Sequence, residues 1–451
     1  MKSSFFYVGT VKAVAAVVLA AVFFGADGAE KLPVRVRAER ESALYRAGEE
    51  IVFRVQALNA EGVPVAGKKL DWTLSGDGGL LKKGTVTPGT DGEKISVTWD
   101  KPGFVLLEVV SPAENGKRPR PVHAGAGVDV EKIRCGAMPP PDFDAFWDAQ
   151  LKELRRRPWK SKLTELKPSP HRGVRIYDVR LDDGTLGVTG YLVIPEKAVK
   201  GGHPAELLFN GAGSIGASWK SAAPRAARYN AIVFDMSVQD VPNGLDDAGR
   251  RALRKSPRIA GYMYRGVESP ETYPIREVFL RVARSIDFVK SLPEWDGRTL
   301  VTFGGSLGGA QSVFAAYAEP QVCLCVANAP ALADHFGAEA GHAAGWPDMF
   351  RTLAKDPEKL AKARKTMRYF DLVNFVRRVK CPVRLSVGFI DRICPPATAY
   401  ALYHAIPGEK SIARVVTGKH GLADDPRERN VFARNIDYVD EILLPAKRKK
   451  K

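Results

Sequence analysis

The chemistry of this chain starts from one serine that has small residues on both sides. Ser306 lies in the sequence Gly-Gly-Ser-Leu-Gly-Gly at residues 304–309, between an apolar run at 300–303 and a small-residue stretch at 310–317. The pattern predicts a strand, a sharp turn and a helix, and such a turn holds the serine hydroxyl clear of its neighbours. The helix that follows points free amides at the turn, where they stabilise developing negative charge. Ser306 is therefore the candidate nucleophile.

A serine nucleophile needs a base and an acid, and both follow it along the chain. The apolar run 383–387 predicts a buried strand, with Asp391 just past its end, and the run 412–416 predicts a second strand, with His420 just past its end. Because the ends of parallel strands meet at one edge of a sheet, both side chains are expected beside the serine turn. The order serine, aspartate, histidine is that of the α/β-hydrolase arrangement. In it, histidine takes the serine proton and the carboxylate orients the imidazole.

Four other residues are weaker candidates for the base and the acid. His335 and His342 lie in a long irregular segment, where loop or cap positions are the ordinary interpretation. His404 lies inside an expected helix, and no strand leads straight into Asp334.

The second half of an oxyanion site should come from the loop after an earlier strand. Residues 206–209 predict that strand, and a glycine-rich loop follows at 210–216. Gly211 and Ala212 are expected to donate backbone N–H groups to the oxyanion, together with Leu307, the residue after the serine. The loop has little side-chain bulk there, so a substrate carbonyl can approach closely.

The same loop also matches a dinucleotide-binding fingerprint. The glycines within residues 211–216 spell G-x-G-x-x-G after a strand, and Asp235 ends the next strand at about the distance expected of a ribose-binding acid. However, two expected strands, 174–181 and 186–194, precede the loop, whereas this fingerprint normally lies on the first strand of its domain. The serine, aspartate and histidine would also have no role under that interpretation.

Composition and the N-terminus indicate an exported globular protein. The chain has 451 residues, of which 45% are hydrophobic and 26% charged, which is enough for two domains or for one large and one small domain. An uninterrupted apolar run at 13–24 follows a short region with two lysines and precedes small residues, which predicts a signal peptide over residues 1–28. The protein is expected to be secreted or periplasmic, with no stable membrane span after cleavage. An uncleaved N-terminal anchor is the alternative.

Cysteines and charge exclude several classes of protein. Five cysteines do not make a disulfide scaffold, although Cys381 and Cys394 bracket the strand before Asp391 and could pair. No metal-binding motif is present, so we predict neither a catalytic metal nor a cofactor. The net charge is +17, of which five charges lie in a basic tail at 447–451. Nothing resembles a nucleic-acid module, so the charge weakly favours anionic surfaces or uronic-acid-bearing polysaccharide.

The N-terminal part of the chain has a different pattern from the rest. Short segments with alternating apolar residues, separated by glycine-containing turns, predict an all-β immunoglobulin-like sandwich at residues 31–130, with Trp72 and Trp99 in its core. Its expected role is packing or spacing, and carbohydrate binding is the alternative.

Residues 138–446 are expected to form the domain that carries the chemistry. Apolar residues at helical spacing over 143–154 introduce this domain, and a second amphipathic helix is expected at 276–292. The fold class is α/β: a doubly wound, mostly parallel α/β-hydrolase sheet, preceded by the sandwich.

From about residue 138 onward the chain resembles the acetyl xylan esterase and cephalosporin C deacetylase family of α/β hydrolases. The matching segments are 141–147, 262–267, 304–309 and 388–396. The resemblance implies removal of small acyl groups, chiefly acetyl, from sugar hydroxyls, so that an acetylated oligo- or polysaccharide would be the substrate.

The resemblance also carries site residues onto this sequence. The family's serine, aspartate and histidine fall on Ser306, Asp391 and His420. Gln239 could match the glutamine of the family's Arg-Gly-Gln motif, and Tyr264 lies in a matching segment, so both are candidate substrate-binding residues. The family forms a ring-like oligomer, which makes an oligomer possible here.

These observations predict a secreted serine carboxylesterase that removes acetyl groups from xylan-type saccharides through an acyl-enzyme. Two alternatives remain. One is a peptidase or other acyl hydrolase on the same fold. The other is a non-catalytic carbohydrate-binding protein in which the sandwich binds the sugar.

Overall fold

The computed structural model describes most of the chain. The described residues are 34–112, 119–425, 428 and 430–444. The predicted signal peptide and the basic tail lie outside them. Within these ranges, no helix is both long enough and apolar enough to cross a bilayer.

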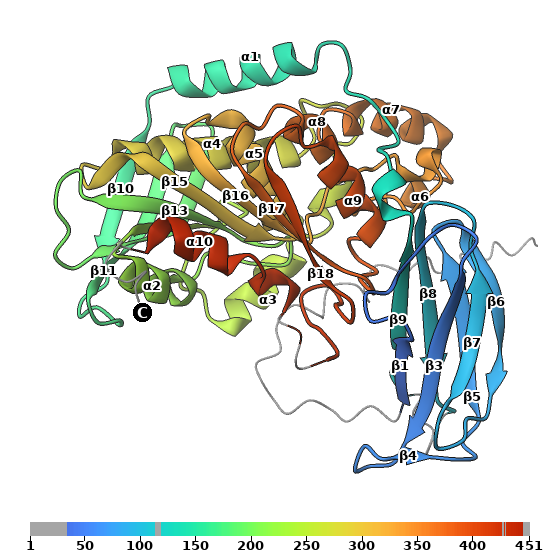
Figure 1. Ribbon diagram of the computed structural model, residues 1–451. Coiled ribbons are helices and arrows are strands. Elements are labelled where there is room, and N and C mark those ends of the chain that lie inside the picture. Colours follow the sequence, from blue (N-terminus) through green and yellow to red (C-terminus); the bar gives the residue numbers. More distant parts are fainter. Residues whose placement is uncertain (1–33, 113–118, 426–427, 429, 445–451) are drawn as a thin grey trace, which may run out of the picture. The chain divides into compact units, whose positions relative to one another are not determined.

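The first nine strands form two sheets whose apolar faces share a core (Figure 1). In one sheet β3 pairs with β1, β4 and β7, and the other has the order β2-β9-β8-β5-β6. Alternate side chains of β3 point into the shared core, and Phe53 and Val55 among them are fully buried. Trp72 and Trp99 pack against this core and are partly buried. The immunoglobulin-like assignment stays a prediction. The strands are β1 (Val34–Ala38), β2 (Leu44–Tyr45), β3 (Glu50–Leu58), β4 (Pro64–Val65), β5 (Leu70–Gly76), β6 (Gly79–Val86), β7 (Glu93–Thr98), β8 (Gly103–Val110) and β9 (Val122–Val128).

A nine-stranded mixed sheet forms the rest of the framework, in the order β10-β11-β12-β14-β13-β15-β16-β17-β18. The adjacent strands β14, β13, β15, β16, β17 and β18 run parallel to one another. By contrast, β10, β11 and β12 are antiparallel to their neighbours. The predicted α/β sheet is therefore confirmed as a mixed sheet. The strands are β10 (Lys160–Glu165), β11 (Val174–Asp182), β12 (Gly187–Pro195), β13 (His203–Phe209), β14 (Ile232–Met236), β15 (Trp295–Gly305), β16 (Val322–Asn328), β17 (Val383–Gly388) and β18 (Lys410–Val415).

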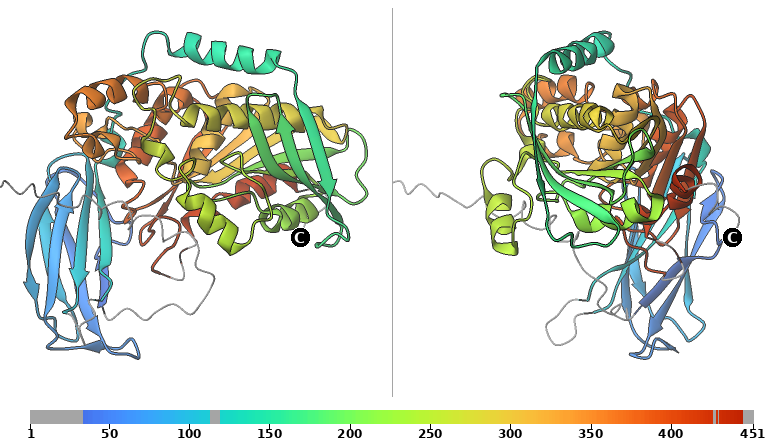
Figure 2. Two further views of the ribbon diagram at one scale, coloured as in Figure 1. Left: turned by 180° about the vertical axis from the view of Figure 1, so that it is seen from behind. Right: turned by 90° about the vertical axis from the view of Figure 1, so that its left-hand side faces the viewer.

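Helices cover both faces of this sheet (Figure 2). One face carries α1 (Phe143–Arg156), α4 (Ile275–Ser291), α5 (Leu307–Ala318), α8 (Leu372–Val376) and α9 (Pro396–Ala405). The other face carries α2 (Trp219–Tyr229) and α10 (Ile436–Leu443). Shorter or peripheral helices are α3 (Asp247–Lys255), α6 (Met349–Thr352), α7 (Pro357–Met367) and the 3-10 turns Val130–Lys132, Tyr262–Tyr264, Gly337–Ala340 and Val431–Ala433.

Helix α1 shows how the sequence pattern becomes packing. Phe143, Trp147, Leu151 and Leu154 recur at intervals of three and four residues, and all four are buried. The indole N–H of Trp147 donates a hydrogen bond to the carbonyl of Tyr369 at 2.9 Å, so its polar atom is satisfied. The predicted helix is confirmed, and it closes one side of the large core.

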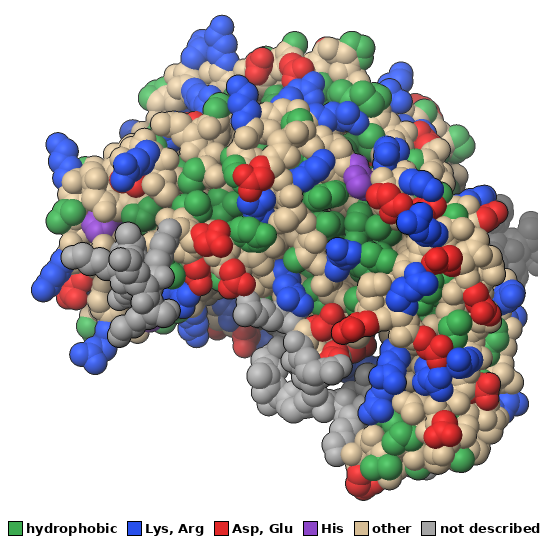
Figure 3. All heavy atoms as spheres, in the orientation of Figure 1, with side chains coloured by type: hydrophobic (Ala, Val, Ile, Leu, Met, Phe, Trp, Pro, Cys, Tyr) green, Lys and Arg blue, Asp and Glu red, His purple; other side chains and the backbone are tan. Residues whose placement is uncertain are grey.

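The face of the molecule drawn in Figure 3 carries charged side chains of both signs. Lys and Arg are interspersed with Asp and Glu on this face and do not form one continuous basic patch (Figure 3). On this face the distribution of charge does not support a basic groove that would bind the phosphates of a nucleic acid.

Candidate active site

Ser306 occupies a strained turn between β15 and α5. Its backbone has φ 58° and ψ −125°, which is unusual for a residue with a side chain. Three hydrogen bonds hold it there: its N–H donates to the Asn328 carbonyl at 2.9 Å, and its carbonyl accepts from Ala331 at 3.0 Å and Ala310 at 3.2 Å. The strand-turn-helix prediction is confirmed, and the strain lies at the residue that presents the hydroxyl.

Two glycines near Ser306 lie where there is no room for a side chain. A Cβ on Gly304 would lie 2.3 Å from the carbonyl oxygen of Gly308. A Cβ on Gly308 would lie 2.1 Å from the carbonyl oxygen of Phe209, at the end of β13. Both clashes are with backbone, so α5 can approach the end of β15 and β13 this closely only if Gly304 and Gly308 carry no side chain.

The three residues predicted from sequence order are joined by hydrogen bonds. His420 Nε2 lies 3.0 Å from Ser306 Oγ, and His420 Nδ1 lies 2.8 Å from Asp391 Oδ2. Because a carboxylate only accepts hydrogen bonds, in the neutral imidazole Nδ1 carries the proton and Nε2 is free to accept from the serine hydroxyl. This is the geometry that lets an imidazole remove a serine proton.

Asp391 is held by its own segment. Its other oxygen, Oδ1, accepts from the backbone N–H groups of Ile393 at 2.8 Å and Cys394 at 2.9 Å. The residue is buried, with 3% of its surface exposed. Both carboxylate oxygens are therefore partnered, and Oδ2 stays directed at the imidazole.

The electrostatic environment of His420 combines two opposing effects. Burial disfavours the charged imidazolium, but Asp391 and Cys394 together favour it more, so the pKa of His420 is raised above its ordinary value. The Cys394 thiol is also close to His420 and Ser306, and burial raises the pKa of this thiol. The thiol is therefore protonated at neutral pH.

Strands β8 and β9 pack directly on the segment that carries Asp391. The rings of Phe104 and Phe389 meet edge to face, with centroids 5.1 Å apart. A Cβ on Gly125 would lie 2.3 Å from the Phe389 carbonyl oxygen, which shows how closely β9 approaches this segment. Arg392 donates a hydrogen bond to Glu108 at 2.8 Å. Residues from the N-terminal sheets thus help to position the backbone on which Asp391 lies.

The predicted oxyanion donors lie around the same turn. The Cα of Gly211 is close to the serine, since a Cβ built on it would be 3.8 Å from Ser306 Cβ. In the described part of the chain, no hydrogen bond occupies the amides of Gly211, Ala212 or Leu307. Leu307 is the first residue of α5, where an amide has no partner within the helix. These amides are available to an incoming oxygen.

The surroundings of Asp235 weigh against the dinucleotide alternative. Asp235 is 1% exposed and accepts a hydrogen bond from Asn210 Nδ2 at 2.6 Å. Burial raises the pKa of Asp235 to about 7. A ribose-binding acid must be ionised and reachable, whereas this carboxyl is enclosed and already paired with the loop.

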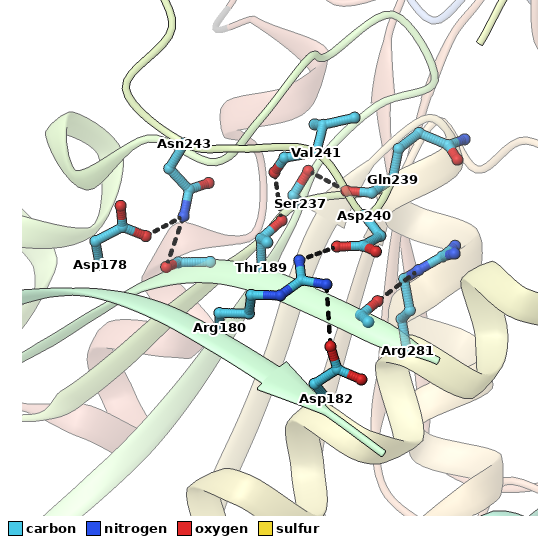
Figure 4. Close-up of polar contacts among 12 residues, drawn as sticks. Asp178, Arg180, Asp182, Thr189, Ser237, Gln239, Asp240, Val241, Asn243 and Arg281 are labelled. Atoms are coloured by element: carbon cyan, nitrogen blue, oxygen red, sulfur yellow. Dashed lines mark hydrogen bonds and ion pairs between the residues drawn. The ribbon is translucent and has the colours of Figure 1, made fainter. Parts of the chain in front are cut away.

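Gln239 lies in the segment that follows β14. Ser237 donates a hydrogen bond to the Gln239 carbonyl at 2.7 Å, and Thr189 donates to the Val241 carbonyl at 2.7 Å. The Gln239 side chain extends away from these contacts (Figure 4), and its buried Nε2 has no hydrogen-bond partner among the described residues. Among the described residues, no hydrogen bond joins Gln239 to Ser306, so its substrate-binding role stays a prediction.

Tyr264 lies in the 3-10 turn Tyr262–Tyr264 and packs against the large core. Burial raises the pKa of its phenol, and the Thr352 hydroxyl lies within hydrogen-bond reach. No hydrogen bond joins it to the triad in the described ranges. Its role also stays a prediction.

The weaker candidates take structural positions. His342 Nε2 lies 3.2 Å from Asp334 Oδ2 and 2.9 Å from the Arg134 carbonyl, deep in the protein. His404 Nε2 lies 3.0 Å from the Val130 carbonyl. His335 is buried, and burial lowers its pKa to about 4. The structure brings none of these residues to Ser306.

Among the described residues, the cysteines form no disulfide and the metal-ligating side chains form no metal site. All five cysteines are free thiols, including Cys381 and Cys394. Among the described residues, no group of three or more His, Cys, Asp or Glu side chains could hold a metal ion.

Two residues that touch the site were missed in the sequence. Phe432 packs against Gly305 and Gly421, on either side of the site. Gln311 is fully buried in α5 and hydrogen-bonded to Asn210, in the loop predicted to bind the oxyanion. A lone glutamine within an otherwise small and apolar helix was a signal that could have identified Gln311. Nothing in the local sequence marks Phe432.

One family of proteins matches more than half of this chain. The family model described as acetyl xylan esterase (AXE1) matches residues 128–432. The acetyl esterase Axe7A of Xylanibacter ruminicola is 32% identical over 316 residues, which are 69% of this chain and 70% of that protein. The chain belongs to the acetyl xylan esterase family and is a carboxylic ester hydrolase.

Two solved structures support the fold. The acetyl xylan esterase from Paenibacillus sp. R4 has a TM-score of 0.56 and 24% identity, covering 64% of this chain and 93% of its own. Acetyl xylan esterase 1 from Thermoanaerobacterium sp. JW/SL YS485 has a TM-score of 0.56 and 24% identity, covering 70% and 96%.

Proposed function

We propose that this protein is an exported serine esterase that removes acetyl groups from the hydroxyls of acetylated xylan-type saccharides. The observation that carries the proposal is the continuous hydrogen-bonded chain from Ser306 through His420 to Asp391, at 3.0 and 2.8 Å. Its place in a family of acetyl xylan esterases supports acetyl as the acyl group. The predicted signal peptide supports export.

The proposed reaction proceeds in two steps. Ser306 Oγ attacks the ester carbonyl while His420 Nε2 takes its proton, and the tetrahedral intermediate collapses to an acetyl-serine as the imidazolium protonates the leaving sugar oxygen. Water then enters, His420 removes its proton, and the acetyl-serine is cleaved to acetate and free serine. Asp391 holds the required tautomer throughout.

The amides of Leu307 and of Gly211 or Ala212 supply the electrostatic part of the mechanism. In both steps the carbonyl oxygen becomes an oxyanion, and two N–H donors that are already oriented stabilise it. Each such donor contributes a factor of roughly 10²–10³ in rate. The small side chains of Gly211 and Ala212 leave room for the acetyl carbonyl.

Substitution of the nucleophile tests the proposal. Ser306→Ala is expected to lower the rate of p-nitrophenyl acetate hydrolysis and of acetate release from acetylated xylan by at least about 10⁴-fold. Labelling by a fluorophosphonate probe is also expected to disappear. Circular dichroism and thermal melting of the variant provide the control for folding. Full activity in a folded Ser306→Ala protein would remove the serine from its role.

Substrate panels separate the alternatives. Acetylated xylan, mannan and pectin, with cephalosporin C, report on acetyl ester hydrolysis, whereas prolyl and aminoacyl amides report on peptidase activity. Turnover of the amides alone would favour a peptidase. Retention on xylan without probe labelling would favour a binding protein.

A further inference from the structure

We propose that Gln311 is a positioning residue that holds the two halves of the oxyanion site in fixed relation. The inference rests on the proposed function, because it assigns a role to a side chain behind the Leu307 and Gly211 amides. Gln311 itself does not touch the reacting atoms.

Gln311 bridges two backbone segments that are far apart in sequence. Its Nε2 donates to the Asn210 carbonyl at 2.9 Å and to the Leu307 carbonyl at 3.1 Å. The residue lies on α5, one turn beyond Leu307, and is completely buried. The Gln311 amide group therefore binds Leu307, whose N–H is one proposed donor. It also binds Asn210, the residue directly before the other proposed donor, Gly211.

Peptide geometry lets the bond to the Asn210 carbonyl control one proposed donor. In a trans peptide the carbonyl and the following N–H lie in one plane and point in opposite directions. A hydrogen bond that holds the Asn210 carbonyl therefore also sets the direction of the Gly211 N–H. The bond to the Leu307 carbonyl ties this plane to the first turn of α5.

The side chain of Asn210 anchors the same end of the loop independently of Gln311. Asn210 Nδ2 donates to Asp235 Oδ1 at 2.6 Å and to the Met236 carbonyl at 3.0 Å, at the end of β14. Asn210 is thus held by its side chain on β14 and by its carbonyl on α5. The peptide plane between Asn210 and Gly211 therefore has little freedom to rotate.

The remaining polar atom of Gln311 supports a role beyond packing. Its Oε1 is buried without a hydrogen-bond partner among the residues that the structure describes. An apolar side chain of similar size would avoid this unsatisfied acceptor. The two hydrogen bonds of Nε2 are what a glutamine provides at this position and an apolar side chain would not.

The first test compares two buried neighbours on α5. Gln311→Leu removes the bridge and is expected to lower kcat for p-nitrophenyl acetate and the rate of fluorophosphonate labelling by about 10- to 100-fold, with little change in KM. Ser312→Ala is the matched control: Ser312 is fully buried, and its hydroxyl donates only within the helix, to the Gly308 carbonyl at 3.1 Å. The control is expected to retain kcat within about twofold.

The second test uses pH and does not depend on the leucine variant folding. In Gln311→Glu, a protonated carboxyl offers one O–H donor, whereas the ionised form offers none and repels both carbonyls. Burial raises the pKa of this carboxyl. The ratio of variant to wild-type kcat is therefore expected to fall as pH rises, with circular dichroism at each pH showing that the protein stays folded.

The outcomes separate this inference from the proposed function. A folded Gln311→Leu with unchanged kcat, or a folded Gln311→Glu whose ratio to wild type does not change with pH, overturns the role of Gln311 even when Ser306→Ala is inactive. An active Ser306→Ala overturns the proposed function instead.

Discussion

The ring of Phe432 stands edge-on against the imidazole of His420, with centroids 5.1 Å apart and planes at 89°. Phe432 also fills the space beside Gly305 and Gly421, where an added Cβ would come within 2.8 and 3.1 Å of its ring. The Asn328 side chain donates to its carbonyl at 3.0 Å. Phe432 therefore packs as a wedge, that is, as a side chain inserted between the serine turn and the histidine loop, and helps to set the distance between them.

Removal of this wedge should impair catalysis more than substrate binding. Phe432→Ala lets the His420 loop shift, and a displacement of a fraction of an ångström lengthens the bond to Ser306 Oγ. We expect kcat for p-nitrophenyl acetate to fall about tenfold or more with KM nearly constant. Steady-state kinetics on the folded variant measure this, and an unchanged kcat would show that the loop is held by other contacts.

The activity should increase toward alkaline pH. In the proposed mechanism the reacting form of His420 is neutral, and Asp391 raises the pKa of the imidazole, so activity should be lost as pH falls through that raised pKa. We expect the midpoint of the kcat/KM profile to lie above the ordinary histidine value of about 6.5. Initial rates of acetate release, corrected for spontaneous hydrolysis, give the profile.

Asp391→Asn provides the contrast for this profile. An uncharged amide no longer stabilises the imidazolium, so the midpoint should move to lower pH. The amide also favours the wrong tautomer, and kcat should drop roughly 10⁴-fold. A midpoint that stays in place in this variant would assign the titration to another group.

The close approach of α5 to β13 should make Gly308 intolerant of even one methyl group. Alanine in a helix is normally better than glycine by about 1 kcal/mol. Here the added Cβ would lie 2.1 Å from the Phe209 carbonyl oxygen, and this backbone clash outweighs the propensity. We expect Gly308→Ala to lose about 3 kcal/mol of stability or more.

Thermal and denaturant unfolding of Gly308→Ala measure this loss. Gly78→Ala is the control, because a Cβ at Gly78 meets no atom within 4 Å. The control should change stability by no more than about 0.5 kcal/mol. Equal stability of the two variants would contradict the argument from space.

Strong local patterns made much of the fold predictable. The apolar runs before Ser306, Asp391 and His420 are strands β15, β17 and β18, and the small-residue stretch after the serine is α5. Strand β10 was missed because its side chains are mostly exposed, so it has no apolar alternation.

By itself, the sequence determined which residue types stand at the ends of which strands, and hence the serine, the acid and the histidine. Strand ends and turn glycines are written in a few consecutive residues, so a local pattern suffices. Only the tertiary structure decided what surrounds them. Gln311 and Asn210 are 101 residues apart, Phe432 and His420 meet through their rings, and Gly125 lies against Phe389. Such contacts depend on how distant segments pack, and no short stretch of sequence encodes them.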